Sequence, residues 1–155
     1  MAAPAPLVLV LGMHRSGTSL LGGVLQRLGL ALPGDTIAGD DHNPEGYFEW
    51  DQVVAIQERL LIDQERWWPA AQGTLALPAG WLEHPATLDA RARLHALLAA
   101  EVAAQEGPWA IKDPRCSRLL PLWLALCREL AIPLQIVLAV RNPAEVVASL
   151  LRRDG

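Results

Sequence analysis

A short apolar run, followed by a glycine-containing loop and then by helically spaced leucines, constrains the fold of this chain more than any other feature. Residues 7–11 read Leu-Val-Leu-Val-Leu, a continuous apolar run typical of a strand that is covered on both faces. From Thr18 onward the apolar residues recur at the spacing of one helix face, at Leu20, Leu21, Val24, Leu25 and Leu28. A strand that leads through a glycine loop into a helix predicts an α/β domain.

The rest of the chain alternates between apolar segments and turn-forming residues, which predicts further strands and helices. Helices are expected over residues 51–65, 87–105, 121–130 and from 143 onward, and strands over residues 109–113 and 134–140. Thr87 is the expected N-cap of the second of these helices, and Asn142 is that of the last, with Pro143 at its first position. Alternating strands and helices favour a central parallel sheet flanked by helices, so we expect one three-layer α/β domain over residues 1–155.

Charge and cysteine content exclude several classes of protein. The chain carries a net charge of −4, which argues against a nucleic-acid binder that depends on bulk positive charge. Its two cysteines, Cys116 and Cys127, are expected to be free, buried thiols of a reducing compartment, the cytoplasm. The N-terminal apolar run is too short to span a membrane, so we expect no membrane partner.

The glycine loop after the first expected strand has the spacing of a phosphate-binding loop without its lysine. That motif is written G-x-x-x-x-G-K-[ST], and here Gly12, Gly17 and Ser19 match it while Thr18 stands in the lysine position. Backbone N–H groups between Gly12 and Ser19, including that of Ser16, can converge on an anion, and Arg15 can contact the same anion. A structural turn between strand and helix is the alternative.

Two further motifs follow the other expected strands. Lys112 and Asp113 end one strand, at the edge of a parallel sheet where ligands bind, and Lys112 there can balance charge that develops on a transferred group. Arg141 ends the next strand, and Ser149 lies two helical turns after Asn142, so the pair can hold one phosphate. The alternative for Lys112 is a lysine paired with Asp113 or another carboxylate, and the alternative for the second motif is a surface arginine with a solvent-facing serine. Because a cation, Arg141, stands where Mg²⁺ chemistry needs a carboxylate, we expect no metal.

These three motifs, in this order, resemble those of the sulfotransferases that use 3′-phosphoadenosine-5′-phosphosulfate (PAPS). The resemblance implies a P-loop-like fold and sulfuryl transfer to a hydroxyl or amine. It implies that the loop containing Arg15, Ser16, Gly17, Thr18 and Ser19 holds the 5′-phosphosulfate. Arg141 and Ser149 match the 3′-phosphate pair of the family in type and spacing. The Lys-Asp-Pro segment at Lys112 is similar to that of tyrosylprotein sulfotransferases, whose lysine stabilises the transferring group.

The proton acceptor for such a transfer is sought in the segment Asp-Asp-His-Asn-Pro-Glu-Gly-Tyr-Phe-Glu at residues 40–49. It offers Glu49, His42 and Glu45, which we favour in that order. Asn43, Gly46, Tyr47 and Glu49 fit the Asn-x-x-Gly-Tyr-x-Glu pattern of related bacterial sequences. Each candidate base can also be a solvated loop residue or a helix cap.

Several expectations remain open. Sulfotransferase domains continue well past the equivalent of Gly155, so we expect an incomplete donor site and an exposed apolar surface that can support self-association. The acceptor can be a carbohydrate, a peptide, a lipid or a small metabolite. Tryptophans 67, 68, 81 and 123 are expected to pack in the core or line the acceptor pocket, and Arg115 and Arg118 to contact a ligand or pair with neighbours. The rival functions are a Mg²⁺-dependent nucleotide kinase and a non-catalytic remnant that binds nucleotide.

Overall fold

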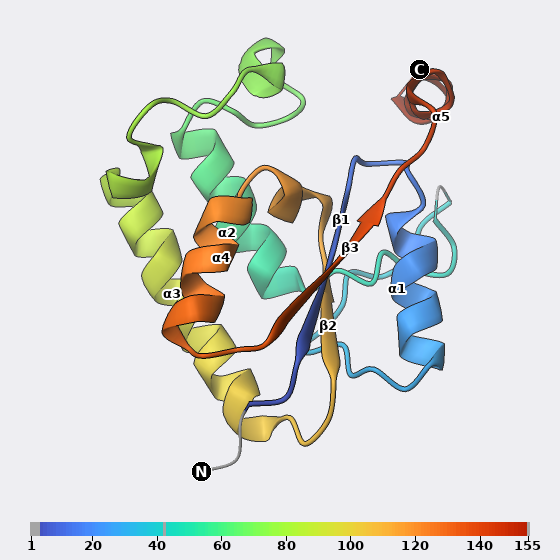
Figure 1. Cartoon of the computed structure of the whole chain (residues 1–155). Helices are drawn as coiled ribbons and strands as arrows, with labels where there is room; N and C mark the ends of the chain where they lie inside the picture. The colour runs from blue at the N-terminus through green and yellow to red at the C-terminus, as the bar shows by residue number, and fades with distance from the viewer. Residues whose placement is uncertain (1–3, 42, 155) are drawn as a thin grey trace.

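A computed structural model describes residues 4–41 and 43–154 as an α/β domain built on a parallel sheet (Figure 1). Its strands and α-helices are, in chain order, β1 (Leu7–Gly12), α1 (Thr18–Arg27), α2 (Asp51–Asp63), α3 (Pro85–Ala104), β2 (Trp109–Lys112), α4 (Leu120–Glu129), β3 (Leu134–Ala139) and α5 (Pro143–Asp154). Short 3-10 helices occur at η1 (Ala71–Thr74), η2 (Trp81–Glu83) and η3 (Pro114–Ser117). The expected elements are therefore present, with bounds that differ by a few residues.

The sheet has the strand order β2-β1-β3 within the described residues, and both pairings are parallel. Leu7 of β1 lies opposite Trp109 of β2 and Leu134 of β3, so the three parallel strands begin at the same level and point in the same direction. Every residue of the central strand β1 is buried, as its unbroken apolar sequence predicts. The loops that follow the three strands consequently lie together at the carboxyl ends of the strands.

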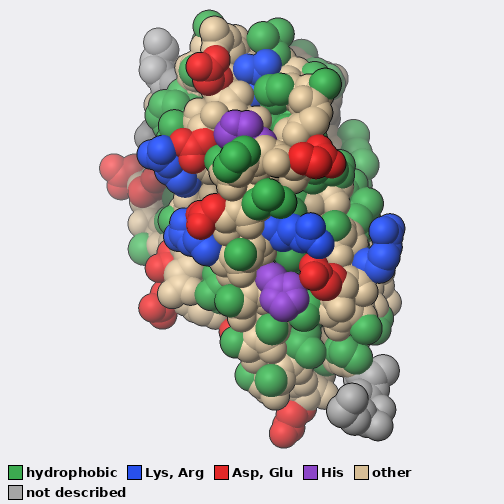
Figure 2. All heavy atoms as spheres, turned by 90° about the vertical axis from the view of Figure 1, so that its left-hand side faces the viewer, with side chains coloured by type: hydrophobic (Ala, Val, Ile, Leu, Met, Phe, Trp, Pro, Cys, Tyr) green, Lys and Arg blue, Asp and Glu red, His purple; other side chains and the backbone are tan. Residues whose placement is uncertain are grey.

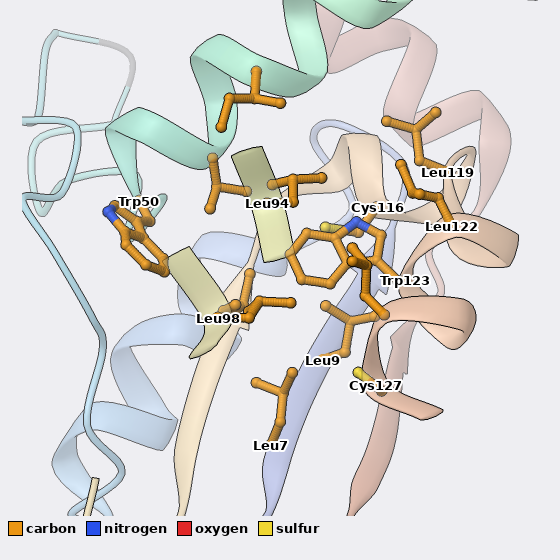
Figure 3. Close-up of a cluster of buried hydrophobic side chains, with 14 of the residues drawn as sticks. Leu7, Leu9, Trp50, Leu94, Leu98, Cys116, Leu119, Leu122, Trp123 and Cys127 are labelled. Atoms are coloured by element: carbon orange, nitrogen blue, oxygen red, sulfur yellow. The ribbon is translucent and has the colours of Figure 1, made fainter. Parts of the chain in front are cut away.

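Helices lie on both sides of the sheet. In Figure 1, α1 stands to the right of the strands, and α2, α3 and α4 stand together to their left. On that left side the apolar side chains of the helices meet those of the strands in one cluster (Figure 3), which includes Leu7, Leu9, Leu94, Leu98 and Trp123. Burying one such leucine stabilises a fold by about 2 kcal/mol, so this cluster is the main source of stability.

A buried glutamine links this core to the carboxyl edge of the sheet. Gln57 of α2 accepts a hydrogen bond from Trp123 Nε1 at 2.9 Å and donates one to Asp113 Oδ2 at 2.7 Å. Gln57 and Asp113 are both fully buried, so leaving either without a partner would cost free energy. Asp113 follows β2 directly, and this contact fixes the point at which that strand leaves the sheet.

The start of α3 corrects one expectation. His84, not Thr87, is the N-cap, because His84 Nδ1 accepts a hydrogen bond from the N–H of Ala86 at 3.2 Å. Pro85 follows at the first helical position, where the missing N–H costs nothing. Thr87 is fully buried inside the first turn, and its hydroxyl accepts a hydrogen bond from Gln64 Nε2 at 3.4 Å.

The edge strand β3 is apolar yet largely exposed. The exposed fraction is 46% for Ile136, 62% for Leu138 and 81% for Val140, the residue that follows the strand. Val147 and Leu151 on α5 are exposed as well, and a groove of about 460 Å³ separates α5 from the end of β3. These side chains form an exposed apolar surface on β3 and α5, and self-association through it stays a prediction.

The opposite side of the molecule has an ordinary mixed surface. Figure 2 shows acidic, basic and apolar side chains interspersed on the side where α3 lies outermost in Figure 1. Arg91 of α3 pairs with Glu129 of α4 at 3.1 Å. Among the described residues, no helix combines the length and the apolar character needed to cross a membrane.

Candidate functional site

A cavity of about 240 Å³ opens where the strand ends meet the start of α1. We call it the basic cavity. The residues around it come from the loop after β1, the segment before α2, the end of β2 and the C-terminal part of the chain: His14, Arg15, Gly17, Thr18, Ser19, Leu20, Asn43, Tyr47, Glu49, Lys112, Pro114, Arg141 and Arg153. The site residues expected from the sequence are thus largely brought together, although they are distant in the chain.

Two glycines shape the loop between β1 and α1. Gly12 has φ +149°, and a Cβ atom there would lie 2.9 Å from Ala139 O, Ser16 Oγ and Thr18 Cγ2, so the close approach of this loop to β3 requires glycine. Gly17 has φ +93° and is the N-cap of α1. The first N–H groups of that helix have no intrahelical acceptor and carry its positive dipole end, which favours an anion in the basic cavity.

Lys112 ends β2 with its ammonium group directed to the loop before α2 and to α1. Its Nζ atom donates hydrogen bonds to Glu49 Oε1 at 2.6 Å, to Tyr47 O at 2.9 Å and to Ser19 Oγ at 3.1 Å. The lysine side chain is 1% exposed. Three acceptors match the three N–H bonds of an ammonium group, so this charge is held in one position.

Glu49 lies between two cations. Its Oε1 atom contacts Lys112, and its Oε2 atom lies 3.4 Å from Arg115 Nη1. Burial raises the pKa of Glu49, the two cations oppose that shift, and the nearby Asp113 carboxylate adds to it. Glu49 therefore fixes the lysine, while it also lines the basic cavity.

The segment that precedes Glu49 is fastened to α1 by an asparagine. Asn43 Nδ2 donates to Ser19 Oγ at 3.1 Å and to Gly46 O at 2.6 Å. Ser19 Oγ thus accepts from both Asn43 and Lys112. These contacts explain the Asn-x-x-Gly-Tyr spacing physically, because the asparagine closes the turn and the tyrosine carbonyl meets the lysine.

The loop after β1 is also tied to α5. Arg15 Nε donates to Ser149 Oγ at 3.0 Å, although 134 residues separate the two in sequence. Arg141 Nη1 donates to the carbonyl oxygen of Arg15 at 3.0 Å, and Arg141 Nε contacts Glu145 at 2.9 Å. The expected phosphate pair, Arg141 and Ser149, is therefore joined through Arg15 rather than by direct contact.

Two residues of the basic cavity were missed by the sequence interpretation. The His14 ring stacks on Trp68 with ring centroids 5.2 Å apart, and the Arg153 guanidinium lies 5.0 Å from the centre of the Trp68 ring. Burial, helped by Arg115, Lys112 and Arg153, lowers the pKa of His14 from 6.5 to about 4. His14 is the neighbour of Arg15 in the loop, and Arg153 lies one helical turn after Ser149. Their positions next to predicted site residues could therefore have indicated both of them.

Several candidate residues lie elsewhere. Ser16 donates its hydroxyl hydrogen to Met13 O and lines the groove beside α5 instead of the basic cavity. Glu45 is exposed and lies 3.9 Å from Arg27. His42 lies outside the described residues.

The two arginines after the Lys-Asp-Pro segment pair with the protein. Arg115 contacts Asp113, Glu58 and Glu49, while its buried Nε atom has no hydrogen-bond partner among the described residues. Arg118 donates to the carbonyl oxygens of Arg66, Gly73 and Leu75, so it holds the irregular segment after α2. Neither arginine lines the basic cavity.

The charge around the basic cavity opposes that of the whole chain. Four cationic side chains, those of Arg15, Lys112, Arg141 and Arg153, and one carboxylate, that of Glu49, line it. The chain as a whole carries a net charge of −4. Such a local reversal, beside a helix N-terminus, indicates a site for a multiply charged anion. No group of three or more metal-ligating side chains occurs in the described part of the chain.

Comparisons with protein-family models, with curated proteins and with solved structures returned no match to this chain. Its function is therefore inferred from the residues of the site.

Proposed function

We propose that this chain is a P-loop-like sulfotransferase that uses PAPS as its donor and a hydroxyl or amine as its acceptor. The observation that carries the proposal is the basic cavity itself, which is lined by four cationic side chains although the chain has a net negative charge. PAPS has two separate anionic ends, and the cationic groups are correspondingly spread from β2 to α5. The α/β sheet with helices on both sides is compatible with the P-loop-like fold that the loop motif implies.

The phosphosulfate end is assigned to the loop after β1. The backbone N–H groups from Gly17 to Ser19 and the Arg15 guanidinium surround the position of an anion there. Arg141, which lines the basic cavity, and Ser149 are assigned to the 3′-phosphate, and their contacts with Arg15 place them next to the phosphosulfate end. The cationic side chains and the N–H dipoles at the start of α1 balance the charge of the donor, so the proposal involves no metal ion.

Lys112 is assigned to the charge that develops when the sulfuryl group leaves its phosphate. Its ammonium group is already oriented by Glu49, so little reorganisation accompanies the reaction. The contact with Ser19 Oγ, at 3.1 Å, is the longest of the three and is the one that a donor oxygen would replace. Both oxygens of Glu49 contact cations, which favours a positioning role for this residue; proton acceptance by Glu49 stays a prediction from the sequence.

The test is turnover by the full chain. PAPS would be incubated with the protein and with a panel of hydroxyl and amine acceptors, and the desulfated product PAP and the sulfated acceptor would be counted by mass spectrometry. The proposal expects both products in equal amounts, without added Mg²⁺. Binding of PAP without turnover would indicate a non-catalytic remnant, and Mg²⁺-dependent transfer from ATP would indicate a kinase. A cytoplasmic location, based on the two free cysteines, stays a prediction.

A further inference from the structure

A second, mostly apolar cavity adjoins the basic cavity. It has a volume of about 420 Å³ and lies between the loop after β1, the segment after α2 and η3. We call it the apolar cavity. Its lining includes Met13, Leu61, Trp68 and Pro114, together with parts of Arg115 and Arg118. A cavity of this size and composition matches a small organic ligand that buries an apolar body.

The two cavities meet at two residues. His14 and Pro114 line both of them, whereas the other members of each set differ. A molecule whose body fills the apolar cavity can therefore present one end to the basic cavity beside His14. Neither ring nitrogen of His14 forms a hydrogen bond with any residue that the structure describes, so the ring has unused hydrogen-bonding capacity at this junction.

We propose, building on the sulfotransferase function proposed above, that the apolar cavity binds a phenol or another alcohol with an apolar body, and that His14 accepts the proton of its hydroxyl group. The observation behind the proposal is the position of His14 in the lining of both cavities. Because the apolar cavity supplies few groups that can replace the hydration of several hydroxyls, a carbohydrate is disfavoured there.

The reaction balances with the groups that are named. The acceptor oxygen forms a bond to the sulfur of PAPS, and the bond between that sulfur and the bridging phosphate oxygen breaks. PAP leaves with the electron pair of the broken bond, next to Lys112. The acceptor proton passes to a His14 ring nitrogen, which requires a neutral ring before the transfer.

The charges around His14 make its proton affinity dependent on the donor. Burial, followed by the charges of Arg115, Lys112 and Arg153, lowers the pKa of the ring to about 4, so the ring is neutral at pH 7 but a weak base. An anionic donor beside Lys112 and Arg153 would offset those charges and raise this pKa. His14 therefore becomes a stronger base when PAPS is bound.

The segment that forms one wall of the apolar cavity is anchored. Arg118 donates to the carbonyl oxygens of Arg66, Gly73 and Leu75, and Arg66 Nε donates to Ala76 O at 2.8 Å. The His14 stack on Trp68 connects the same segment to the loop after β1. The wall is thus held to Arg118, which follows η3, by hydrogen bonds and to the loop after β1 by the ring stack, which preserves the cavity shape.

The cavity is tested first by binding, without turnover. The probe is 2-naphthol, titrated into the full chain by calorimetry, with glucose as the carbohydrate comparison. Thr74→Trp places a large ring in the cavity from an exposed position, and Ala70→Trp adds the same ring nearby, outside the cavity lining. We expect 2-naphthol to bind the parent chain and Ala70→Trp with similar affinity, and to bind Thr74→Trp at least tenfold more weakly. We expect no binding of glucose to any of the three proteins.

PAP titration of the same proteins separates this proposal from the proposed function. Absence of 2-naphthol binding to the parent chain, or equal binding to Thr74→Trp, overturns the cavity assignment even where PAP binds normally. Binding of 2-naphthol without PAP binding supports the ligand class of the cavity and counts against the sulfotransferase.

The role of His14 is tested by His14→Gln, assayed with PAPS and 2-naphthol across pH. We expect kcat to fall at least tenfold, KM for 2-naphthol to change little, and the rise of kcat with pH to disappear. An unchanged pH profile, or loss confined to KM, overturns proton acceptance by His14.

Discussion

Lys112 Nζ lies 2.6 Å from Glu49 Oε1, and both side chains are almost completely buried, at 1% and 7% exposed. Taking two charges out of water is costly, and the cost is recovered here through hydrogen bonds from the lysine to three acceptors. Such a pair adds little stability compared with apolar side chains, so its value lies in holding one ammonium group beside the basic cavity.

The pair makes a first prediction about stability. Lys112→Met leaves Glu49 buried with only Arg115 as a cationic partner, so we expect the free energy of unfolding to fall by about 3 kcal/mol. The double variant Lys112→Met/Glu49→Gln removes both charges and should lose less than the sum of the two single variants. Urea denaturation of the four proteins measures this coupling. Strict additivity would show that the two residues do not stabilise each other.

The same lysine carries a prediction about catalysis. Lys112→Ala removes charge that matters most in the transition state, so kcat should fall by about 100-fold or more, while donor affinity changes far less. Turnover with PAPS and calorimetric binding of PAP give the two quantities. Equal losses in both would mean that Lys112 serves only in binding.

The lowered pKa of His14 leads to a prediction of how the free energy of unfolding depends on pH. Its pKa in the folded chain, about 4, lies below the ordinary 6.5, so the folded state binds fewer protons than the unfolded state between these values. Stability should therefore fall as the pH is lowered from 6.5 to 4, with up to about 3 kcal/mol from this residue. His14→Gln should flatten this part of the curve, as measured by urea denaturation at each pH. The same slope in both proteins would contradict the prediction.

The surroundings of Gly12 lead to the prediction that a larger residue at this position destabilises the loop. Gly12→Ala combines a positive φ with three contacts at 2.9 Å, so we expect a loss of about 3 kcal/mol in unfolding free energy. Gly29→Ala is the matched control, because Gly29 has φ +91° but open space around the added methyl group. It should cost about 1 kcal/mol, from the backbone alone. Thermal denaturation compares the two, and similar losses would show that the approach to β3 is unimportant.

Arg141 predicts an electrostatic contribution to donor binding. Arg141→Met should weaken PAP binding about tenfold, and this loss should shrink at high salt. Arg59→Met is a close control, since Arg59 also pairs with a carboxylate four residues later, on α2 away from the basic cavity. It should leave PAP binding unchanged in calorimetry. Equal weakening by both variants would indicate a non-specific charge effect.

The strand, loop and helix at the start of the chain were predictable because local chemistry determines them. The apolar run of β1 and the spacing of Gly12 and Gly17 each admit few alternatives. The parallel sheet followed from the alternation of strands and helices. Because parallel strands end at one edge, Lys112 and Arg141 could be placed near the loop before their contacts were known.

The remaining features depend on contacts between distant segments. The Lys112–Glu49 pair joins residues 63 positions apart. The pKa of His14 is lowered by burial and by the charges of Arg115, Lys112 and Arg153, which lie far from it in the sequence. The cap of α3 was misplaced because Thr87 has the stronger cap propensity, while the Pro85 position favours His84. The exposure of β3 could not be predicted either, because an apolar run does not specify which helices or strands pack against it.

The central claim, a donor site for PAPS built from the loop and the strand ends, is tested most directly by calorimetric titration of the full chain with PAP, with and without Mg²⁺, and with ATP for comparison. The proposal predicts saturable PAP binding that is unaffected by Mg²⁺ and tighter than ATP binding. Mg²⁺-dependent binding of ATP in preference to PAP, or no binding of PAP at all, would contradict it.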